Sequence, residues 1–223
     1  MAIMKVVFLT PMEIGLKLLH SMFLAFTHYT SIPDPDALKT LLPPARLARL
    51  TGDDPGALFA YGLLALVLER HFGQNPQEIV YTDTGRPHLP GFPLHLSLSH
   101  AKTHALCAVS DMPVGCDIET HRPISAHTIR RVLADTEEEA DFFAYWTLKE
   151  SYFKLKGDLS QPFSAVRFAL SGDAASGADT HGFLYREIPG CTAAVLAGTP
   201  FARPLLRFLS PEQLFSYAAE KYT

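Results

Sequence analysis

Two short stretches of this sequence place charged side chains where an ordinary protein core would not need them. In VGCDIE (residues 114–119) the carboxylates Asp117 and Glu119 are two residues apart, so in a strand both project from one face. Two such carboxylates suit Mg²⁺, which takes one or two protein oxygens and fills its shell with water and phosphate oxygens. For this hexapeptide alone, an edge strand with two solvated acids is the simpler alternative.

The second stretch, WTLKESYFKLKG (residues 146–157), reads as a helix with one polar stripe. Trp146, Glu150 and Lys154 are four residues apart and therefore share one face. Apolar side chains cover much of the rest: Phe142, Phe143, Leu148, Tyr152, Phe153 and Leu155. A helix buried on its other sides must turn such a stripe toward water, a partner or a ligand. An intrahelical Glu150–Lys154 pair, worth about 0.2–0.5 kcal/mol, is the alternative.

Basic and polar side chains lie between these stretches and an earlier helix. GRPHLP and SLSHAKTH contribute Arg86, Ser97, Ser99, His100 and His104. Arginine binds phosphate through two parallel hydrogen bonds, and a histidine at a strand end can donate to a pyrophosphate oxygen, although a single histidine is more often a turn or surface residue. A zinc site of His95, His100, His104 and Cys107 is disfavoured, because no pair has zinc-finger spacing.

The periodicity of the chain predicts an α+β fold that can position these residues. Helices are expected at 57–71, 126–133 and 211–220, and a longer one starts at a capping box of Thr136 and Glu139, runs through 142–156 and ends at Gly157. Strands are expected at 94–100, 104–110, 114–119, 164–170, 183–188 and 192–198. Turn-rich spacers occupy 31–36, 50–56, 85–93 and 170–182.

Composition restricts the class of protein. The chain has 223 residues, 48% of them hydrophobic, and a net charge of −4, which excludes a disordered chain and gives no global basic field for nucleic acid. The run 6–9 is too short for a signal-peptide core, and the apolar run 59–68 is about half a membrane span. Three cysteines cannot all pair internally, so we expect a soluble cytoplasmic protein.

Four motifs in order carry a resemblance to a known family. G-R-P (85–87), S-x-S-H (97–100), V-G-C-D-I-E (114–119) and W-x-x-K-E-x-x-x-K-x-x-G (146–157) resemble those of the 4′-phosphopantetheinyl transferases. The length is similar to the long, pseudo-dimeric, surfactin-synthetase-activating type. That type implies two pseudo-symmetric halves, each a small antiparallel sheet packed against a long helix. Residues 1–112 would form the N-terminal half, and 113–223 the C-terminal half with the metal-binding motifs.

The resemblance also implies an activity. It is transfer of the 4′-phosphopantetheine arm of coenzyme A to a serine of an apo acyl, polyketide or peptidyl carrier protein, with release of adenosine 3′,5′-bisphosphate. Mg²⁺, or alternatively Mn²⁺, would assist, and the enzyme would act as a monomer with neither nucleic acid nor membrane as partner. Two other hypotheses are a coenzyme A- or carrier-binding module without turnover and a structural α+β protein with coincidental motifs.

Site residues follow from the same resemblance. Asp117, Glu119 and Glu150 would bind the metal, and the catalytic set would be Glu150, Lys154 and Asp117. The residues that would contact coenzyme A are Arg46, Arg49, Arg86, Ser99, His100, Lys149 and Lys154. For Lys149 a ligand contact and a role in supporting the helix both stay open. The sequence departs from the family pattern at Arg86, where lysine is usual, and at Ser97, where asparagine is common.

Overall fold

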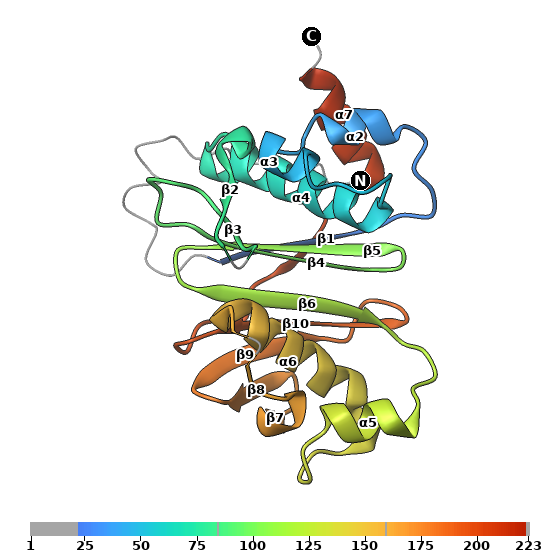
Figure 1. The fold of residues 1–223 in the computed structure, drawn as a ribbon, viewed down its shortest axis with the longest axis vertical. Coiled ribbons are helices and arrows are strands. Elements are labelled where there is room, and N and C mark those ends of the chain that lie inside the picture. Colours follow the sequence, from blue (N-terminus) through green and yellow to red (C-terminus); the bar gives the residue numbers. More distant parts are fainter. Residues whose placement is uncertain (1–21, 84, 159, 222–223) are drawn as a thin grey trace, which may run out of the picture.

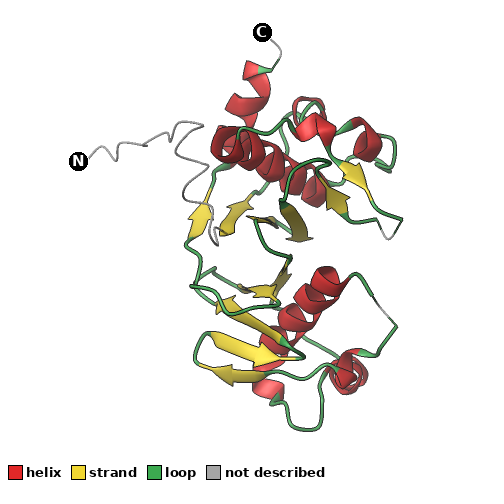
Figure 2. Ribbon diagram, turned by 90° about the vertical axis from the view of Figure 1, so that its left-hand side faces the viewer, coloured by secondary structure: helices red, strands yellow, loops and turns green. Residues whose placement is uncertain are grey.

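A computed structural model describes residues 22–83, 85–158 and 160–221. These residues form four layers in the order helices, sheet, sheet, helices (Figures 1 and 2). Each sheet is covered on its outer face by one long helix, which confirms the expected α+β fold with two halves. The short run at 6–9 lies outside the described residues.

The first sheet has six strands in the order β11-β1-β5-β4-β3-β2. They are β1 (Met22–His28), β2 (Val80–Tyr81), β3 (Pro87–His88), β4 (His95–Ala101), β5 (His104–Ser110) and β11 (Leu206–Phe208). All neighbouring strands are antiparallel except β1 and β11, which are parallel. The helices of this half are α2 (Pro35–Lys39), α3 (Pro44–Leu47), α4 (Pro55–Phe72) and α7 (Pro211–Glu220).

The second sheet has five antiparallel strands in the order β6-β10-β9-β8-β7. They are β6 (Val114–Thr120), β7 (Ala169–Ser171), β8 (Ala174–Gly177), β9 (Thr180–Tyr185) and β10 (Cys191–Ala197). Helix α6 (Phe142–Lys156) packs on β6 and β10, and α5 (Ala126–Val132) lies beside it. Three 3₁₀ turns complete the described elements: Pro76–Glu78, Glu139–Asp141 and Phe163–Ala165.

Three hydrophobic cores hold the layers together, and each is built from the apolar face of a helix or sheet. One lies between α4 and the first sheet, where α4 is buried from Gly56 to Leu68. A second lies between α6 and the second sheet. The third joins the two sheets and contains Cys116 and Ile118 of β6, which confirms that these two point away from the face of Asp117.

Serine side chains of β4 join the two sheets next to the third core. The backbone N–H of Cys116 donates to Ser97 Oγ at 2.9 Å, and that of Ile118 donates to Ser99 Oγ at 3.4 Å. Thr120 Oγ1 donates to the carbonyl of Ala101 at 3.4 Å. The S-x-S motif therefore fixes β6 against β4, although the two strands belong to different sheets.

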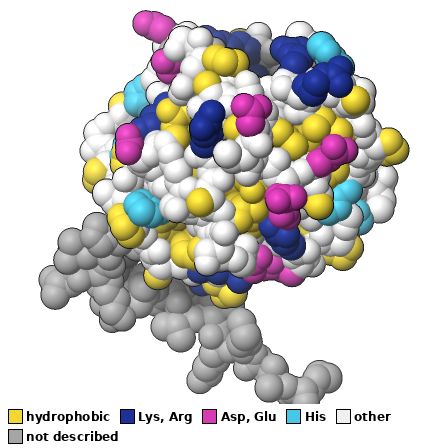
Figure 3. Space-filling model, turned by 90° about the horizontal axis from the view of Figure 1, so that it is seen from below, with side chains coloured by type: hydrophobic (Ala, Val, Ile, Leu, Met, Phe, Trp, Pro, Cys, Tyr) yellow, Lys and Arg dark blue, Asp and Glu magenta, His cyan; other side chains and the backbone are white. Residues whose placement is uncertain are grey.

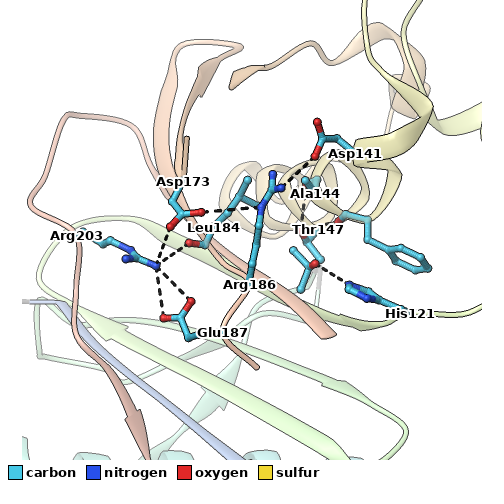
Figure 4. A network of polar contacts seen from close by, with 11 residues as sticks. His121, Asp141, Ala144, Thr147, Asp173, Leu184, Arg186, Glu187 and Arg203 are labelled. Carbon is cyan, nitrogen blue, oxygen red and sulfur yellow. Dashed lines mark hydrogen bonds and ion pairs between the residues drawn. The ribbon is translucent and has the colours of Figure 1, made fainter. Parts of the chain in front are cut away.

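Exposed ion pairs tie the start of α6 to the second sheet (Figure 4). Arg186 bonds Asp141, the residue before α6, at 3.1 Å and lies 3.9 Å from Asp173. Arg203 lies 3.5 Å from Asp173 and 3.4 Å from Glu187. Because all of these side chains are partly exposed, each pair contributes about 0–1 kcal/mol to stability.

Most predicted elements are confirmed, with a few corrections. The structure has α6, α7 and β5 at the predicted residues and α4, α5, β4, β6 and β10 within two residues of their predicted ends. The capping box was wrong: α6 follows a 3₁₀ turn, and its N-cap Asp141 makes no side-chain capping bond. Of the strand expected at 164–170, only residues 169 and 170 are in a strand, β7, and residues 164 and 165 end a 3₁₀ turn. The strand expected at 183–188 is β9 shifted toward its N-terminus, and the spacer 170–182 contains β8.

The final strand and helix return to the first half. β11 pairs with β1, and α7 packs on α2 and α4. Residues 206–220 therefore belong by contact to the first sheet and its helices. The division of the chain into halves at residue 112 stays a prediction.

None of the helices in the described ranges has the length and apolar character needed to cross a membrane. Acidic, basic and hydrophobic side chains are intermixed on the outer face of the second half (Figure 3).

Candidate active site

The carboxylates of β6 face helix α6, and a glycine makes that approach close. Gly115, Asp117 and Glu119 alternate along β6 and share one face. A Cβ built on Gly115 would lie 1.9 Å from the carbonyl oxygen of Ser151 and 2.7 Å from the backbone nitrogen of Leu155. Only a residue without a side chain lets α6 lie this near to β6, so the glycine of the VGCDIE motif brings α6 to the acids.

Helix α6 turns its polar stripe away from the core, as the sequence predicts. Trp146, Glu150 and Lys154 are partly exposed, whereas ten residues of α6 are buried. The helix ends at Gly157, which has a left-handed φ of 71° and whose N–H donates to the carbonyl of Phe153. Glu150 and Lys154 therefore point toward the first half of the molecule.

A cavity of about 430 Å³ lies where the two halves meet. The first half contributes Arg46, Tyr61, Arg86 and His100, and α6 with its C-cap Gly157 contributes Glu150, Phe153 and Lys154. Five predicted site residues thus line one cavity: Arg46, Arg86, His100, Glu150 and Lys154. The others lie behind its wall or further away.

Asp117 lies directly behind this cavity and is held on two sides. Its Oδ1 accepts from Ser99 Oγ at 2.6 Å and from Lys154 Nζ at 2.8 Å, and the residue is 4% exposed. Burial by itself would lower the pKa of Lys154, but the charge of Asp117, its hydrogen bond to Lys154 and the neighbouring Cys116 and Glu150 together more than offset this, so the pKa is raised. Ser99 thus orients Asp117, and its hydroxyl is not among the groups that line the cavity.

Burial and the negative charge of Asp117 raise the pKa of both other predicted metal ligands, Glu119 and Glu150. Burial raises the pKa of Glu150, and the charges of Asp117 and Glu119 raise it further, while Lys154 opposes them. Burial also raises the pKa of Glu119, against the lowering by Arg122, whose guanidinium donates to Glu119 Oε2 at 2.6 Å. Mutual repulsion of this kind is what a bound cation relieves.

The donor set fits a hard divalent cation. The Oδ2 atom of Asp117 is buried and makes no hydrogen bond, so one ligand position is already unsatisfied. Within the described part of the chain, however, no three His, Cys, Asp or Glu side chains are grouped so that they could hold a metal as they stand. The assignment of Asp117, Glu119 and Glu150 as a metal centre therefore stays a prediction.

Of the two predicted arginines in the segment before α4, one lines the cavity and the other does not. Arg46 lines the cavity, its guanidinium 5.4 Å from the ring centre of Tyr61, and its buried Nε makes no hydrogen bond. Arg49 stacks on Tyr81 at 5.2 Å, outside the cavity lining. The hydroxyl of Tyr81 donates to that of Tyr61 at 2.6 Å, so one tyrosine pair supports both arginines.

Arg86, directly before β3, and His100 of β4 reach the cavity from the first half. Arg86 crosses to the second half, where a Cβ on Gly157 would lie 3.1 Å from its guanidinium nitrogen and 3.2 Å from its Cδ. Burial lowers the pKa of Arg86, which stays charged at neutral pH. The Nε2 atom of His100 lies 3.9 Å from Asp54 Oδ2. Both side chains therefore reach the rim from elements distant in sequence from α6.

Lys149, the remaining motif lysine, is buried away from the cavity. Its side chain is 0% exposed, bonds Glu137, and donates to the carbonyl of Val132 at 2.6 Å. Glu137 also accepts from the backbone N–H groups of Ala134 at 2.8 Å and Phe168 at 3.2 Å. Lys149 therefore supports α6 from inside the second half, and its contact with coenzyme A stays a prediction.

Sequence reasoning missed several residues of the site. Tyr61 and Phe153 line the cavity but read as core positions, because their helices are apolar on most sides. Glu137, the partner of Lys149, carries no motif and is recognisable only from the fold. A glycine inside the first turn of α4, Gly56, was also overlooked. A glycine there works against helix formation and could have signalled a close contact.

Comparison with known proteins agrees with this geometry. Residues 113–195, which include β6 and α6, match the family model described as the 4′-phosphopantetheinyl transferase superfamily. The chain is 29% identical to the 4′-phosphopantetheinyl transferase Sfp of Bacillus subtilis, over 68% of this chain and 78% of the relative. It is 31% identical to HetI of Nostoc and 34% identical to psf-1 of Bacillus pumilus, both described as 4′-phosphopantetheinyl transferases.

The matched regions differ in extent. The matches to HetI and psf-1 cover 49% and 50% of this chain and about half of each relative, 55% and 56%. The family match falls on the strand and helix that supply the acids and Lys154, and the longer match to Sfp extends over most of both chains. These matches support the 4′-phosphopantetheinyl transferase superfamily, and its Sfp-like type, for this chain.

Proposed function

We propose that this chain transfers the 4′-phosphopantetheine arm of coenzyme A to a serine hydroxyl of an apo carrier protein. The observation that carries the proposal is the cavity between the halves, in which Arg46, Arg86 and His100 from one half meet Glu150 and Lys154 from the other. Cationic donors around a cavity with a carboxylate in its wall suit a substrate rich in phosphate and a reacting hydroxyl.

The reaction is a phosphoryl-type transfer. The serine oxygen attacks the β-phosphorus of coenzyme A, the bond from that phosphorus to the bridging oxygen breaks, and adenosine 3′,5′-bisphosphate leaves with the electron pair. Such a reaction is accelerated mainly by positioning and by neutralising charge on the phosphate oxygens. Lys154, held by Asp117, and Arg86 and His100 at the rim are the groups that would supply this neutralisation.

Glu150 is the group best placed to accept the serine proton. It lies in the cavity wall, and burial and neighbouring acids raise its pKa above the ordinary glutamate value. A carboxylate with a raised pKa is the stronger base, and at neutral pH the positive charge of Lys154 favours its ionised form. We therefore assign Glu150 the role of general base.

Asp117, Glu119 and Glu150 would hold a Mg²⁺ ion. When bound, the ion would neutralise negative charge on the pyrophosphate, and Mn²⁺ is an alternative with the same oxygen preference. The unsatisfied Oδ2 atom of Asp117 supports this assignment. Coenzyme A and an apo carrier protein would be the partners, in the cytoplasm, with one chain forming the complete site. Neither nucleic acid nor a membrane is required.

Mass spectrometry of an apo acyl carrier protein incubated with this protein, coenzyme A and Mg²⁺ tests the proposal. We expect a mass gain of one phosphopantetheine arm, absent with EDTA and reduced at least about 100-fold in rate by Glu150→Gln, because removal of a general base costs about 10²–10⁴-fold. Glu139→Gln, at an exposed acid three residues before α6, is the matched control and should react like the wild-type protein.

The negative outcomes separate the alternatives. No mass gain with acyl or peptidyl carriers, together with retained binding of coenzyme A, would support a binding module that has lost turnover. An unaltered rate in Glu150→Gln would instead remove the assignment of the base and leave the transferase activity standing.

A further inference from the structure

The first turn of α4 leaves a space that the ring of His100 occupies. A Cβ built on Gly56 would lie 2.2 Å from His100 Nδ1, 2.5 Å from Cγ and 2.9 Å from Cε1. Real Cβ atoms do not approach other atoms so closely, so any side chain at position 56 would displace the ring. His100 is therefore seated directly against the backbone of α4.

The backbone itself gives no reason for a glycine at this position. Gly56 is not among the described residues with positive φ, so an alanine could adopt the same conformation. Inside a helix, glycine is less favourable than alanine by about 1 kcal/mol. Helix stability alone would thus favour alanine at position 56, and the ring of His100 supplies a reason for glycine.

The cap of the same helix borders His100 on its other side. Asp54 Oδ1 accepts from the backbone N–H groups of Gly56 at 3.0 Å and Ala57 at 3.4 Å. Asp54 Oδ2 lies 3.9 Å from His100 Nε2. Ala57, the next residue of α4, lines the cavity together with His100. The helix start therefore borders His100 on both ring nitrogens.

We propose that Gly56 is a positioning residue for coenzyme A recognition: it leaves the space that holds His100 at the rim of the cavity. The inference rests on the proposed function, in which His100 contacts a phosphate of coenzyme A. Gly56 itself touches no substrate, and its whole effect passes through His100.

Gly56→Ala tests the proposal, with Gly62→Ala as its matched control in the same helix. A Cβ on Gly62 would meet only side-chain atoms at 3.7–3.8 Å, an ordinary contact. Both variants should fold and resist urea at least as well as the wild-type protein. A lost hydrogen bond to a charged group corresponds to about 10- to 100-fold. We therefore expect Gly56→Ala to raise the KM and Kd for coenzyme A by about that factor, and Gly62→Ala to leave both unchanged.

A double-mutant cycle separates positioning from other effects. In the His100→Ala background, Gly56→Ala should cause no further loss, because the group on which it acts is gone. The KM for the carrier protein should stay at its wild-type value in every variant. An equal loss with and without His100, wild-type coenzyme A affinity in Gly56→Ala, or failure of Gly56→Ala to fold would each overturn the proposal.

The outcome for Gly56 is distinguishable from that for the proposed function. If the wild-type protein transfers no phosphopantetheine but binds coenzyme A in calorimetry, the proposed function fails and the Kd values still decide the role of Gly56. If it transfers the arm and Gly56→Ala behaves like Gly62→Ala, only the positioning role fails. If the wild-type protein does not bind coenzyme A, both fail.

Discussion

At the residue scale, the two lysines of the WTLKESYFKLKG stretch serve different parts of the molecule. Lys154 lines the cavity and donates a hydrogen bond to Asp117, whereas Lys149 is buried inside the second half and forms an ion pair with Glu137. Burial lowers the pKa of Lys149, and Glu137 opposes this change. Because the pair is fully buried, each partner depends on the other to avoid an uncompensated charge.

Lys149→Met should therefore lower the free energy of unfolding by about 3–5 kcal/mol, the cost of breaking a buried ion pair. Combining it with Glu137→Leu should recover only part of that loss: no charge is then left unpaired, but the backbone N–H groups of Ala134 and Phe168 lose their acceptor. Lys156→Met, at an exposed lysine of the same helix, is the control and should be neutral within about 0.5 kcal/mol. Urea unfolding measures all three.

A different result would reassign Lys149. If Lys149→Met unfolds like the wild-type protein but binds coenzyme A more weakly, the side chain contacts ligand, which the motif resemblance also allowed. The sequence does not distinguish the two roles, because both lysines lie in the same motif. Glu137, whose carboxylate decides the matter, carries no recognisable pattern.

At the scale of elements, the contact of α6 with β6 sets the geometry of the site. Gly115→Ala would drive a Cβ into the backbone of α6 at Ser151 and Leu155, which cannot swing aside as a side chain can. We expect a loss of about 1–3 kcal/mol in unfolding free energy or more, and weaker coenzyme A binding because Glu150 and Lys154 move with the helix.

Gly198→Ala is the matched control for this prediction. Position 198 directly follows β10 of the second sheet, and a Cβ there meets no atom within 4 Å. Thermal unfolding and calorimetry of both variants give the two readouts. A Gly115→Ala protein with wild-type stability and affinity would show that the close approach is not needed.

Local sequence signals predicted the elements near the site better than those at the outer edge of the second sheet. Helix α6 has a strong apolar pattern and a terminating glycine, and β5 is a short apolar run, so both were predicted at their observed residues. β8 is AASG, four small residues without polar–apolar alternation, and it is held in the sheet by pairing with β7 and β9. Such strands are specified by tertiary contacts that no local pattern records.

At the scale of the whole molecule, the site exists because two layered halves pack through their sheets. β6 follows β5 of the first sheet in sequence and carries two of the acids, and the serines of β4 hold it in place. The four motifs predicted which residues would meet, since they name both sides of the cavity. The return of β11 and α7 to the first half could not be predicted, because a three-residue parallel strand gives no long-range signal.

The most direct test of the account is the affinity for coenzyme A when each half of the cavity is altered separately. Calorimetric titration should compare the wild-type protein with His100→Ala, from the first half, and Lys154→Met, from the second. Lys156→Met serves as the control for the lysine. Each of the first two changes removes one charge-assisted contact, so we predict a weakening of about 10- to 100-fold for either and none for the control. Wild-type affinity in His100→Ala or in folded Lys154→Met would contradict a single coenzyme A site built from both halves.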